Sequence, residues 1–211
     1  MKGFYNSIRI KKDTVKFIKD NIILITMFLS VVMGIVIGSL LIRNGWFAEQ
    51  FNFASVFKNF VSQRSSLSTF KIILFSASSN LGYLCLAYFI GLFAFGTPFS
   101  FVLLISKGIG IGTVCGYLYS VFGLKGVAFA ILIILPNAFI SSVVLSYACN
   151  MSYMLSKRLL NIFIKEDICC SLKPVFSKYS SRYLVFILLM LISSIVDAVM
   201  SSVFIGVFGL V

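Results

Sequence analysis

Five long apolar stretches dominate this sequence and limit what it can fold into. They lie at residues 22–42, 72–95, 99–122, 127–149 and 183–204. Each is long enough to cross the ~30 Å hydrocarbon core of a bilayer as a helix, which takes about 20 residues. Of the 211 residues, 60% are hydrophobic and 11% are charged, whereas soluble domains carry about 25% charged residues. The stretches predict an all-α membrane protein, a polytopic bundle of about five transmembrane helices.

Short turn sequences separate the three middle stretches. Gly96-Thr97-Pro98 predicts a tight turn that leads into a helix, and Gly123-Leu124-Lys125-Gly126 predicts another. The segment 1–21 is basic and amphiphilic, but the apolar run after it is longer than the roughly 7–15 residues of a signal peptide's apolar region. We therefore expect a cytoplasmic segment at 1–21, followed by one integral membrane domain at 22–211.

The distribution of Lys and Arg predicts the orientation. Six precede the first stretch and six lie between the fourth and fifth, against five on the opposite side. Because cytoplasmic segments carry the excess of Lys and Arg, the N-terminus is expected inside and the C-terminus outside. The three groups are Lys2, Arg9, Lys11, Lys12, Lys16 and Lys19; Lys157, Arg158, Lys165, Lys173, Lys178 and Arg182; and Arg43, Lys58, Arg64, Lys71 and Lys125.

Two longer segments connect the predicted spans. The outer loop, 43–71, carries aromatic residues among polar ones, namely Trp46, Phe47, Phe51, Phe57 and Phe60. The inner loop, 150–182, has apolar residues at helical spacing from Met151 onward, close to basic residues. For each loop, two interpretations stay open: a helix lying on the membrane surface, and a contact surface for a partner.

Four polar residues interrupt four of the apolar stretches at similar depth: Lys107, Asp197, Asn80 and Asn137. With a rise of ~1.5 Å per residue, they fall in a band about 8 Å thick around the bilayer midplane. A charge there costs ~2.5–3.5 kcal/mol, so Lys107 and Asp197 are expected to face the bundle interior and to interact directly or through water. Three interpretations remain: a clamp that fixes helix register, a path for a solute or protons, and snorkelling of Lys107 toward the inner headgroups.

Glycines at spacing four mark faces on two of the stretches: Gly34 and Gly38 on the first, and Gly108, Gly112 and Gly116 on the third. Such small-residue faces let helix backbones approach closely in lipid, and we expect them to pack helices together. Pro136 predicts a kink in the fourth stretch, because proline removes one backbone N–H from the helix.

The residue types needed by most enzymes and metal sites are scarce. There is no histidine, which excludes histidine bases and the usual zinc ligands. Cys85, Cys115, Cys149, Cys169 and Cys170 form no CxxC pair and are expected as free thiols. The net charge of +12 lies mainly in blocks beside apolar stretches, which favours anionic lipid headgroups over nucleic acid as the partner. We expect no catalytic residue, no metal and no cofactor.

The region from Gly91 to Asn137 combines several of these features. In order, it contains Gly96-Thr97-Pro98, Ser106-Lys107-Gly108, Gly112, Gly116, Gly123-Leu124-Lys125-Gly126 and Leu135-Pro136-Asn137. This pattern resembles the stage II sporulation protein M family of bacterial membrane proteins. The basic N-terminus, the outer loop and the five spans extend the resemblance over nearly the whole chain. The sequence departs from the family pattern where Pro136 directly precedes Asn137 and where Asp197 replaces a glutamate, as a divergent paralogue would.

The resemblance implies a scaffold and no enzymatic activity. The family's namesake holds two peptidoglycan hydrolases, stage II sporulation proteins D and P, at the engulfing membrane of endospore-forming bacteria. The resemblance therefore implies a multi-pass protein of the mother-cell or septal membrane that acts in cell-wall remodelling, either as one copy or as a homo-oligomer. The alternative is a membrane subunit of a transporter, paired with a separate ATP-binding protein that docks on the inner loop.

Overall fold

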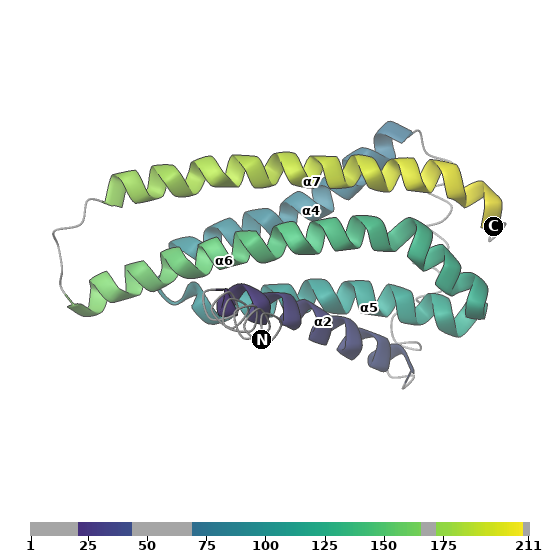
Figure 1. Ribbon diagram of the computed structural model, residues 1–211, viewed down its shortest axis with the longest axis horizontal. Coiled ribbons are helices and arrows are strands. Elements are labelled where there is room, and N and C mark those ends of the chain that lie inside the picture. Colours follow the sequence, from purple (N-terminus) through teal and green to yellow (C-terminus); the bar gives the residue numbers. More distant parts are fainter. Residues whose placement is uncertain (1–20, 44–68, 166–171, 209–211) are drawn as a thin grey trace, which may run out of the picture.

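The structure, a computed structural model, describes residues 21–43, 69–165 and 172–208. All regular secondary structure in these residues is helical: α2 (Ile22–Arg43), α4 (Thr69–Leu92), α5 (Gly96–Phe129), the π-helical η1 (Ala130–Ile134), α6 (Leu135–Lys165) and α7 (Leu172–Phe208). Figure 1 shows the helices lying lengthwise along one axis. The predicted all-α class is confirmed for the described part of the chain.

Within the described ranges, four helical stretches are long and apolar enough to cross a membrane. They are Ile22–Arg43, Phe70–Leu92, Gly96–Ile162 and Val175–Val203. The third contains 67 residues, which would extend about 100 Å as a straight helix, against a bilayer core of ~30 Å. It therefore has to fold back on itself.

The fold-back lies at Gly123, inside α5. This residue has φ 56° and ψ −132°, a left-handed conformation that favours glycine because glycine has no Cβ. In Figure 1 the chain reverses at the right-hand end of the molecule, and α6 returns along α5. The turn that Gly123–Gly126 predicts is therefore made at its first residue, and the long apolar stretch consists of two antiparallel arms.

The turn between α4 and α5 lies slightly earlier than the sequence predicts. The N–H of Phe93 donates to the carbonyl of Ile90 at 3.3 Å, and the N–H of Gly96 donates to the carbonyl of Phe93 at 3.0 Å. Gly96, Thr97 and Pro98 already form the first turn of α5. Pro98 fits there because the first N–H groups of a helix have no intrahelical acceptor.

The two C-terminal helices extend well beyond the predicted spans 127–149 and 183–204. α6 continues to Lys165 and α7 begins at Leu172, so helix occupies most of the predicted inner loop, 150–182. The apolar spacing after Met151 belongs to α6 itself. Neither glycine nor proline occurs between residues 137 and 165, so nothing in the sequence ends this helix at the predicted boundary.

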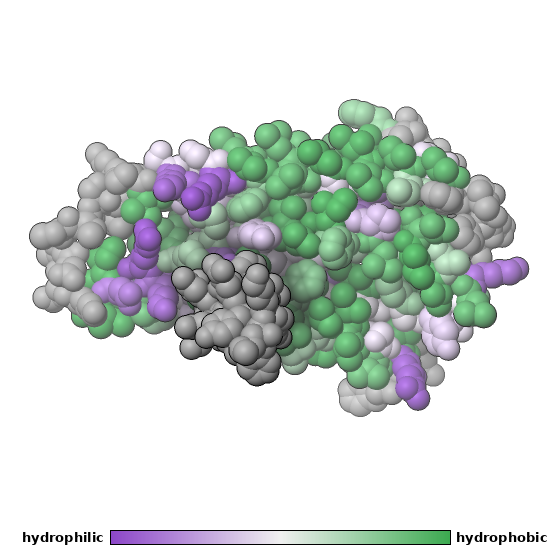
Figure 2. Space-filling model, in the orientation of Figure 1, coloured by the Kyte–Doolittle hydropathy of each residue, from purple (hydrophilic) through white to green (hydrophobic). Residues whose placement is uncertain are grey.

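Apolar side chains cover the middle of the molecule, and hydrophilic ones gather at its two ends (Figure 2). Large apolar side chains of the described helices remain highly exposed, such as Leu74 at 62%, Phe139 at 60% and Leu188 at 61%. A water-soluble surface rarely exposes so large a continuous apolar area. The described surface thus fits a protein whose middle is surrounded by lipid.

Candidate functional site

The ammonium group of Lys107 on α5 is stabilised by contacts with side chains of α4. It donates a hydrogen bond to Asn80 Oδ1 on α4 at 3.0 Å. It also lies 4.6 Å from the centroid of the Tyr83 ring, within the roughly 6 Å at which a cation is attracted to an aromatic face. These contacts explain how an apolar helix can carry a lysine near its centre.

Asn137 on α6 connects three helices. Its Oδ1 accepts hydrogen bonds from Asn80 Nδ2 at 3.4 Å and from Ser193 Oγ on α7 at 2.6 Å. Its Nδ2 donates to Ser76 Oγ on α4 at 3.4 Å. The amide therefore uses both its acceptor and its donor, and α4, α6 and α7 are joined at one level of the bundle.

Asp197 on α7 is almost completely buried, with 1% of its surface exposed. It lines a cavity of about 240 Å³ together with Tyr83, Lys107, Asn137 and Ser141. Its carboxylate interacts electrostatically with Lys107. The structure thus places Lys107, Asn137 and Asp197 around one small cavity, and Asn80 is hydrogen-bonded to the first two. We call these four residues the polar layer.

Two serines of this network do not stand out in the sequence. Ser76 precedes Asn80 by four residues on α4, and Ser193 precedes Asp197 by four residues on α7. Residues four apart lie on the same face of a helix. This spacing is the signal that would have pointed to both serines, once Asn80 and Asp197 were placed in the bundle interior.

The chemistry available to the polar layer is limited. It offers one ammonium group, one carboxylate, two amides and hydroxyl groups, with no thiol or imidazole among the residues that line the cavity. Within the described residues no group of three or more His, Cys, Asp or Glu could hold a metal ion. Such a layer can fix the register of helices, or it can exchange a proton or bind a small polar solute.

A second polar cluster lies closer to the end of the bundle where α6 ends and α7 begins. Ser152 on α6 is fully buried, and its Oγ donates to the carbonyl of Ala87 on α4 at 2.7 Å. The hydroxyls of Tyr179 and Tyr183 on α7 lie 3.1 and 2.6 Å from this Oγ. Tyr88 on α4 stacks on Tyr179, with ring centroids 5.2 Å apart. We call these four side chains (Ser152, Tyr88, Tyr179 and Tyr183) the hydroxyl cluster; the sequence analysis did not single them out.

The two glycine ridges lie against each other, on α2 and α5. A Cβ built on Gly34 would lie 2.9 Å from the Gly108 Cα, and one built on Gly112 would lie 2.9 Å from the Ile35 Cα. A Cβ on Gly38 would lie 2.9 Å from the Thr113 backbone nitrogen, while Gly116 has slightly more room. Only residues without a side chain allow backbones to approach this closely.

Pro136 lies at the start of α6, directly after the π-helical segment η1. Figure 1 shows the ribbon bending at this end of α6. Since proline has no N–H to donate to the preceding turn, the wider π turn accommodates the missing hydrogen bond. Asn137 follows at once, so the bend sets the position from which its side chain enters the bundle.

Some of the predicted contact residues lie outside the described residues. These are the aromatic residues of the outer loop, Trp46, Phe47, Phe51, Phe57 and Phe60. The same holds for Cys169, Cys170 and the basic N-terminal segment. Their predicted roles stay predictions.

The fold and the polar layer define a polytopic helical membrane protein with an intramembrane network of polar side chains. The chain belongs to the stage II sporulation protein M family, because the family model described as stage II sporulation protein M matches residues 22–202. This match covers all the described helices except the end of α7, and it confirms the resemblance seen in the sequence. No curated protein and no solved structure gives a significant match.

Proposed function

We propose that this protein is a non-enzymatic membrane scaffold that recruits and holds peptidoglycan hydrolases for septal cell-wall remodelling and engulfment during endospore formation. The family match over residues 22–202 carries the proposal. The partners are extracytoplasmic hydrolases that resemble stage II sporulation proteins D and P. The protein acts in the mother-cell or septal membrane of a sporulating host.

The packing of the bundle supports a scaffold. Polar side chains in the interior form hydrogen bonds with one another, such as those of Lys107 with Asn80 and of Ser193 with Asn137. Among the described residues, Asn150 Oδ1 is the only buried side-chain nitrogen or oxygen without a hydrogen bond. A network satisfied to this degree favours one rigid arrangement of the helices, which a platform for other proteins requires.

The proposal includes five membrane crossings with the N-terminus inside. Alternating helix directions support this count. α2 runs parallel to α5, since Gly34 meets Gly108 and Ser39 meets Gly116. α6 and α7 run antiparallel, since Ser152 contacts Tyr183 whereas Asn137 contacts Ser193. In this arrangement the outer loop, 43–71, and the C-terminus face the compartment of the hydrolases.

The orientation can be tested by labelling single cysteines in intact cells. In a chain whose five native cysteines are replaced by serine, Lys125→Cys should react with a membrane-impermeant maleimide and Lys157→Cys should not. Labelling of Lys157→Cys alone would reverse the proposed orientation.

The scaffold role is tested by purifying the tagged protein in mild detergent from sporulating and from growing cells and identifying its partners by mass spectrometry. Recovery of extracytoplasmic peptidoglycan hydrolases, mainly during sporulation, is the expected result. Replacing Phe51 and Phe57 by serine should weaken this recovery if the outer loop makes the contact. Recovery of a cytoplasmic ATP-binding protein under both conditions would overturn the scaffold role.

Two observations favour a second candidate, a membrane subunit of a transporter. The cavity of about 240 Å³ lies beside Lys107 and Asp197, and a π-helical segment precedes α6. Both features occur in sites that bind ions or small solutes within membranes. The double variant Lys107→Gln, Asp197→Asn removes both charges and keeps hydrogen-bonding groups. A scaffold should keep its partners and its function in this variant, whereas a transporter should lose activity.

A further inference from the structure

A basic cavity lies between α6 and α7, at the end of the bundle opposite the Gly123 turn. Its volume is about 430 Å³, and its lining includes Arg158 from α6 and Lys178 and Arg182 from α7. This volume lies within the roughly 300–1,000 Å³ of typical small-ligand sites. Neither the polar layer nor the proposed scaffold role uses this cavity.

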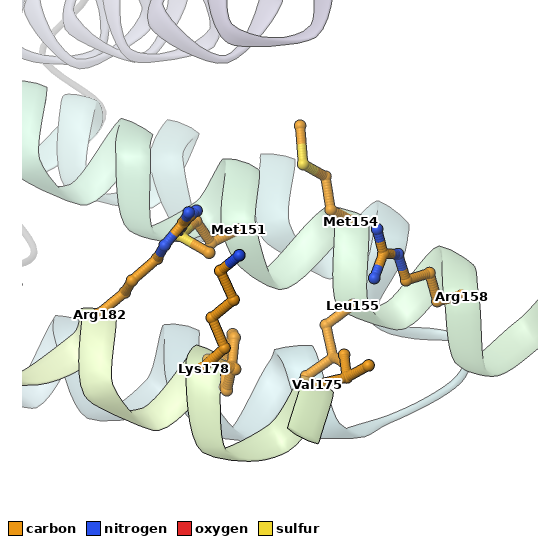
Figure 3. Close-up of a pocket in the computed structure, with 8 residues that line it drawn as sticks. Met151, Met154, Leu155, Arg158, Val175, Lys178 and Arg182 are labelled. Carbon is orange, nitrogen blue, oxygen red and sulfur yellow. Dashed lines mark hydrogen bonds between the residues drawn. The ribbon is translucent and has the colours of Figure 1, made fainter. Parts of the chain in front are cut away.

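The three basic side chains come from two helices. Lys178 and Arg182 are four residues apart, so they lie on one face of α7, and Figure 3 shows both side chains reaching toward α6. The Arg182 guanidinium reaches Met151 on α6, with Nη1 3.7 Å from the methionine sulfur. Arg158 borders the same space from α6. The three positive charges are exposed to solvent, and all of them border the same open cavity.

No acidic side chain balances these charges among the described residues that line the cavity. Asp197 is the one acidic residue within the described ranges, and it belongs to the polar layer. Positive charges held close together repel one another, and an anion placed among them removes this repulsion. Arginine and lysine also form strong, charge-assisted hydrogen bonds with phosphate oxygens. The cavity is thus complementary to a phosphate-bearing anion.

The position and the apolar part of the cavity favour a lipid over a free anion. Leu155 and Val175 provide apolar lining beside the basic groups. Arg182 and Lys178 precede the predicted fifth span by one and five residues, which places them within about 8 Å of the hydrocarbon. This is the depth of phospholipid headgroups, which extend roughly 5–8 Å beyond the core on each side. These residues belong to the side of the predicted topology that carries the excess of Lys and Arg. This excess predicts the cytoplasmic leaflet, where anionic lipids attract basic segments.

We propose that this cavity binds the headgroup of an anionic phospholipid. The phosphodiester accepts hydrogen bonds from Arg158, Lys178 and Arg182, and the acyl chains continue along the apolar surface of the bundle. The basic N-terminal segment is a poor alternative occupant, because it carries six Lys and Arg against Asp13 and Asp20.

The test measures lipid retention by the purified full-length chain. The protein is exchanged into a neutral detergent, incubated with phosphatidylglycerol or phosphatidylcholine, and examined by native mass spectrometry. The wild type should retain phosphatidylglycerol, and Lys178→Gln should lower this retention about tenfold, as expected for the loss of one charge-assisted contact. Arg158→Gln should have a similar effect. The matched control is Lys157→Gln, which removes the same charge from the adjacent residue of α6; Lys157 is exposed like Arg158 but does not line the cavity.

Several results would overturn the proposal. Equal losses in Lys157→Gln and Arg158→Gln would indicate diffuse attraction of anions, and equal retention of phosphatidylcholine would exclude headgroup recognition. Displacement of the lipid by millimolar inorganic phosphate would indicate a site for a free anion.

Two acidic residues, Glu166 and Asp167, lie outside the described residues. The double variant Glu166→Gln, Asp167→Asn therefore tests whether they occupy the cavity. A several-fold gain in retention would show that these acids fill the cavity themselves. Thermal unfolding of each variant in detergent verifies that it is folded. If Arg158→Gln does not fold, the Lys178→Gln result alone tests the proposal.

Discussion

Two regions of this bundle hold helices together in opposite ways. Between α2 and α5, glycine ridges bring the backbones into contact, as at Gly34 and Gly108. Among α4, α6 and α7, side chains make the connections, through the polar layer and the hydroxyl cluster around Ser152. In lipid, apolar burial alone does not drive helix association, so close packing and interhelical hydrogen bonds must do so. The contact between α2 and α5 relies on close packing of backbones. The contacts among α4, α6 and α7 add interhelical hydrogen bonds.

The difference indicates where each region is vulnerable. A glycine interface tolerates no added atom, because the obstacle is the backbone of the facing helix. A side-chain network tolerates changes of shape, but it depends on every buried donor and acceptor keeping a partner. The following variants probe this contrast in order of decreasing effect.

The largest effect is expected for Asp197→Lys. This change places a second positive charge beside Lys107 at a position that is only 1% exposed, and a buried charge that loses its opposite partner costs about 3–5 kcal/mol. The protein should fail to accumulate in membranes, as measured by immunoblotting of the membrane fraction. The exchange Lys107→Asp with Asp197→Lys restores one charge of each sign and should recover accumulation at least in part. If it recovers nothing, the two residues do not act as a pair.

Gly112→Ala should have the next largest effect. Its Cβ would collide with the backbone of Ile35 on α2, so we expect a loss of about 2–3 kcal/mol, in the upper range for overpacking. Unfolding in detergent by heat or denaturant measures it. Gly110→Ala is the control on the same helix, since a Cβ there meets nothing within 4 Å, and the better helix propensity of alanine should make it neutral or stabilising. Equal effects at both positions would contradict the glycine interface.

Ser152→Ala should cost less, about 1–2 kcal/mol. The change removes the hydrogen bond to the Ala87 carbonyl and the contacts with the Tyr179 and Tyr183 hydroxyls. These two hydroxyls keep backbone carbonyls as acceptors, that of Tyr88 at 3.0 Å and that of Ala148 at 3.2 Å, which limits the loss. The same unfolding measurement applies. Ser181→Ala, whose exposed hydroxyl bonds only within its own helix in the described structure, should change stability little, and a larger effect there would contradict the cluster's role.

The smallest effect is expected for Tyr88→Phe, about 0.5–1 kcal/mol. It removes one hydroxyl, which lies 3.1 Å from Ser180 Oγ, and keeps the ring that stacks on Tyr179. A double-mutant cycle with Ser180→Ala sharpens the comparison, because the two losses should not add. Additive losses would show that the two hydroxyls do not interact.

Much of the fold follows from the sequence because lipid imposes simple requirements on it. The predicted first span, 22–42, agrees with α2 (Ile22–Arg43) because its apolar run ends at an arginine. The glycine ridges could be identified because spacing four on an apolar helix has few other uses. Lys107 and Asp197 could be placed inside because lipid excludes isolated charges.

The remainder depended on information that the sequence does not contain. The end of α6 at Lys165 is not marked by a glycine or proline directly after it. Ser152 and Tyr183 are common residue types on apolar helices, and only the packing of α4 against α6 and α7 shows that they meet. Hydrogen bonds between distant helices are selected by three-dimensional arrangement, and a single sequence does not display it.

The contact between α2 and α5 also constrains the order of biogenesis. Gly34 and Gly108 are 74 residues apart, so at roughly 5–20 residues per second the ribosome needs about 4–15 s to supply the partner. During this interval α2 resides in the bilayer without the helix it will pack on. Its glycine face is narrow, and most of its remaining surface is apolar, with Leu29 54% and Met33 55% exposed even in the finished bundle. α2 is thus a helix that lipid alone can accommodate until its partner is made.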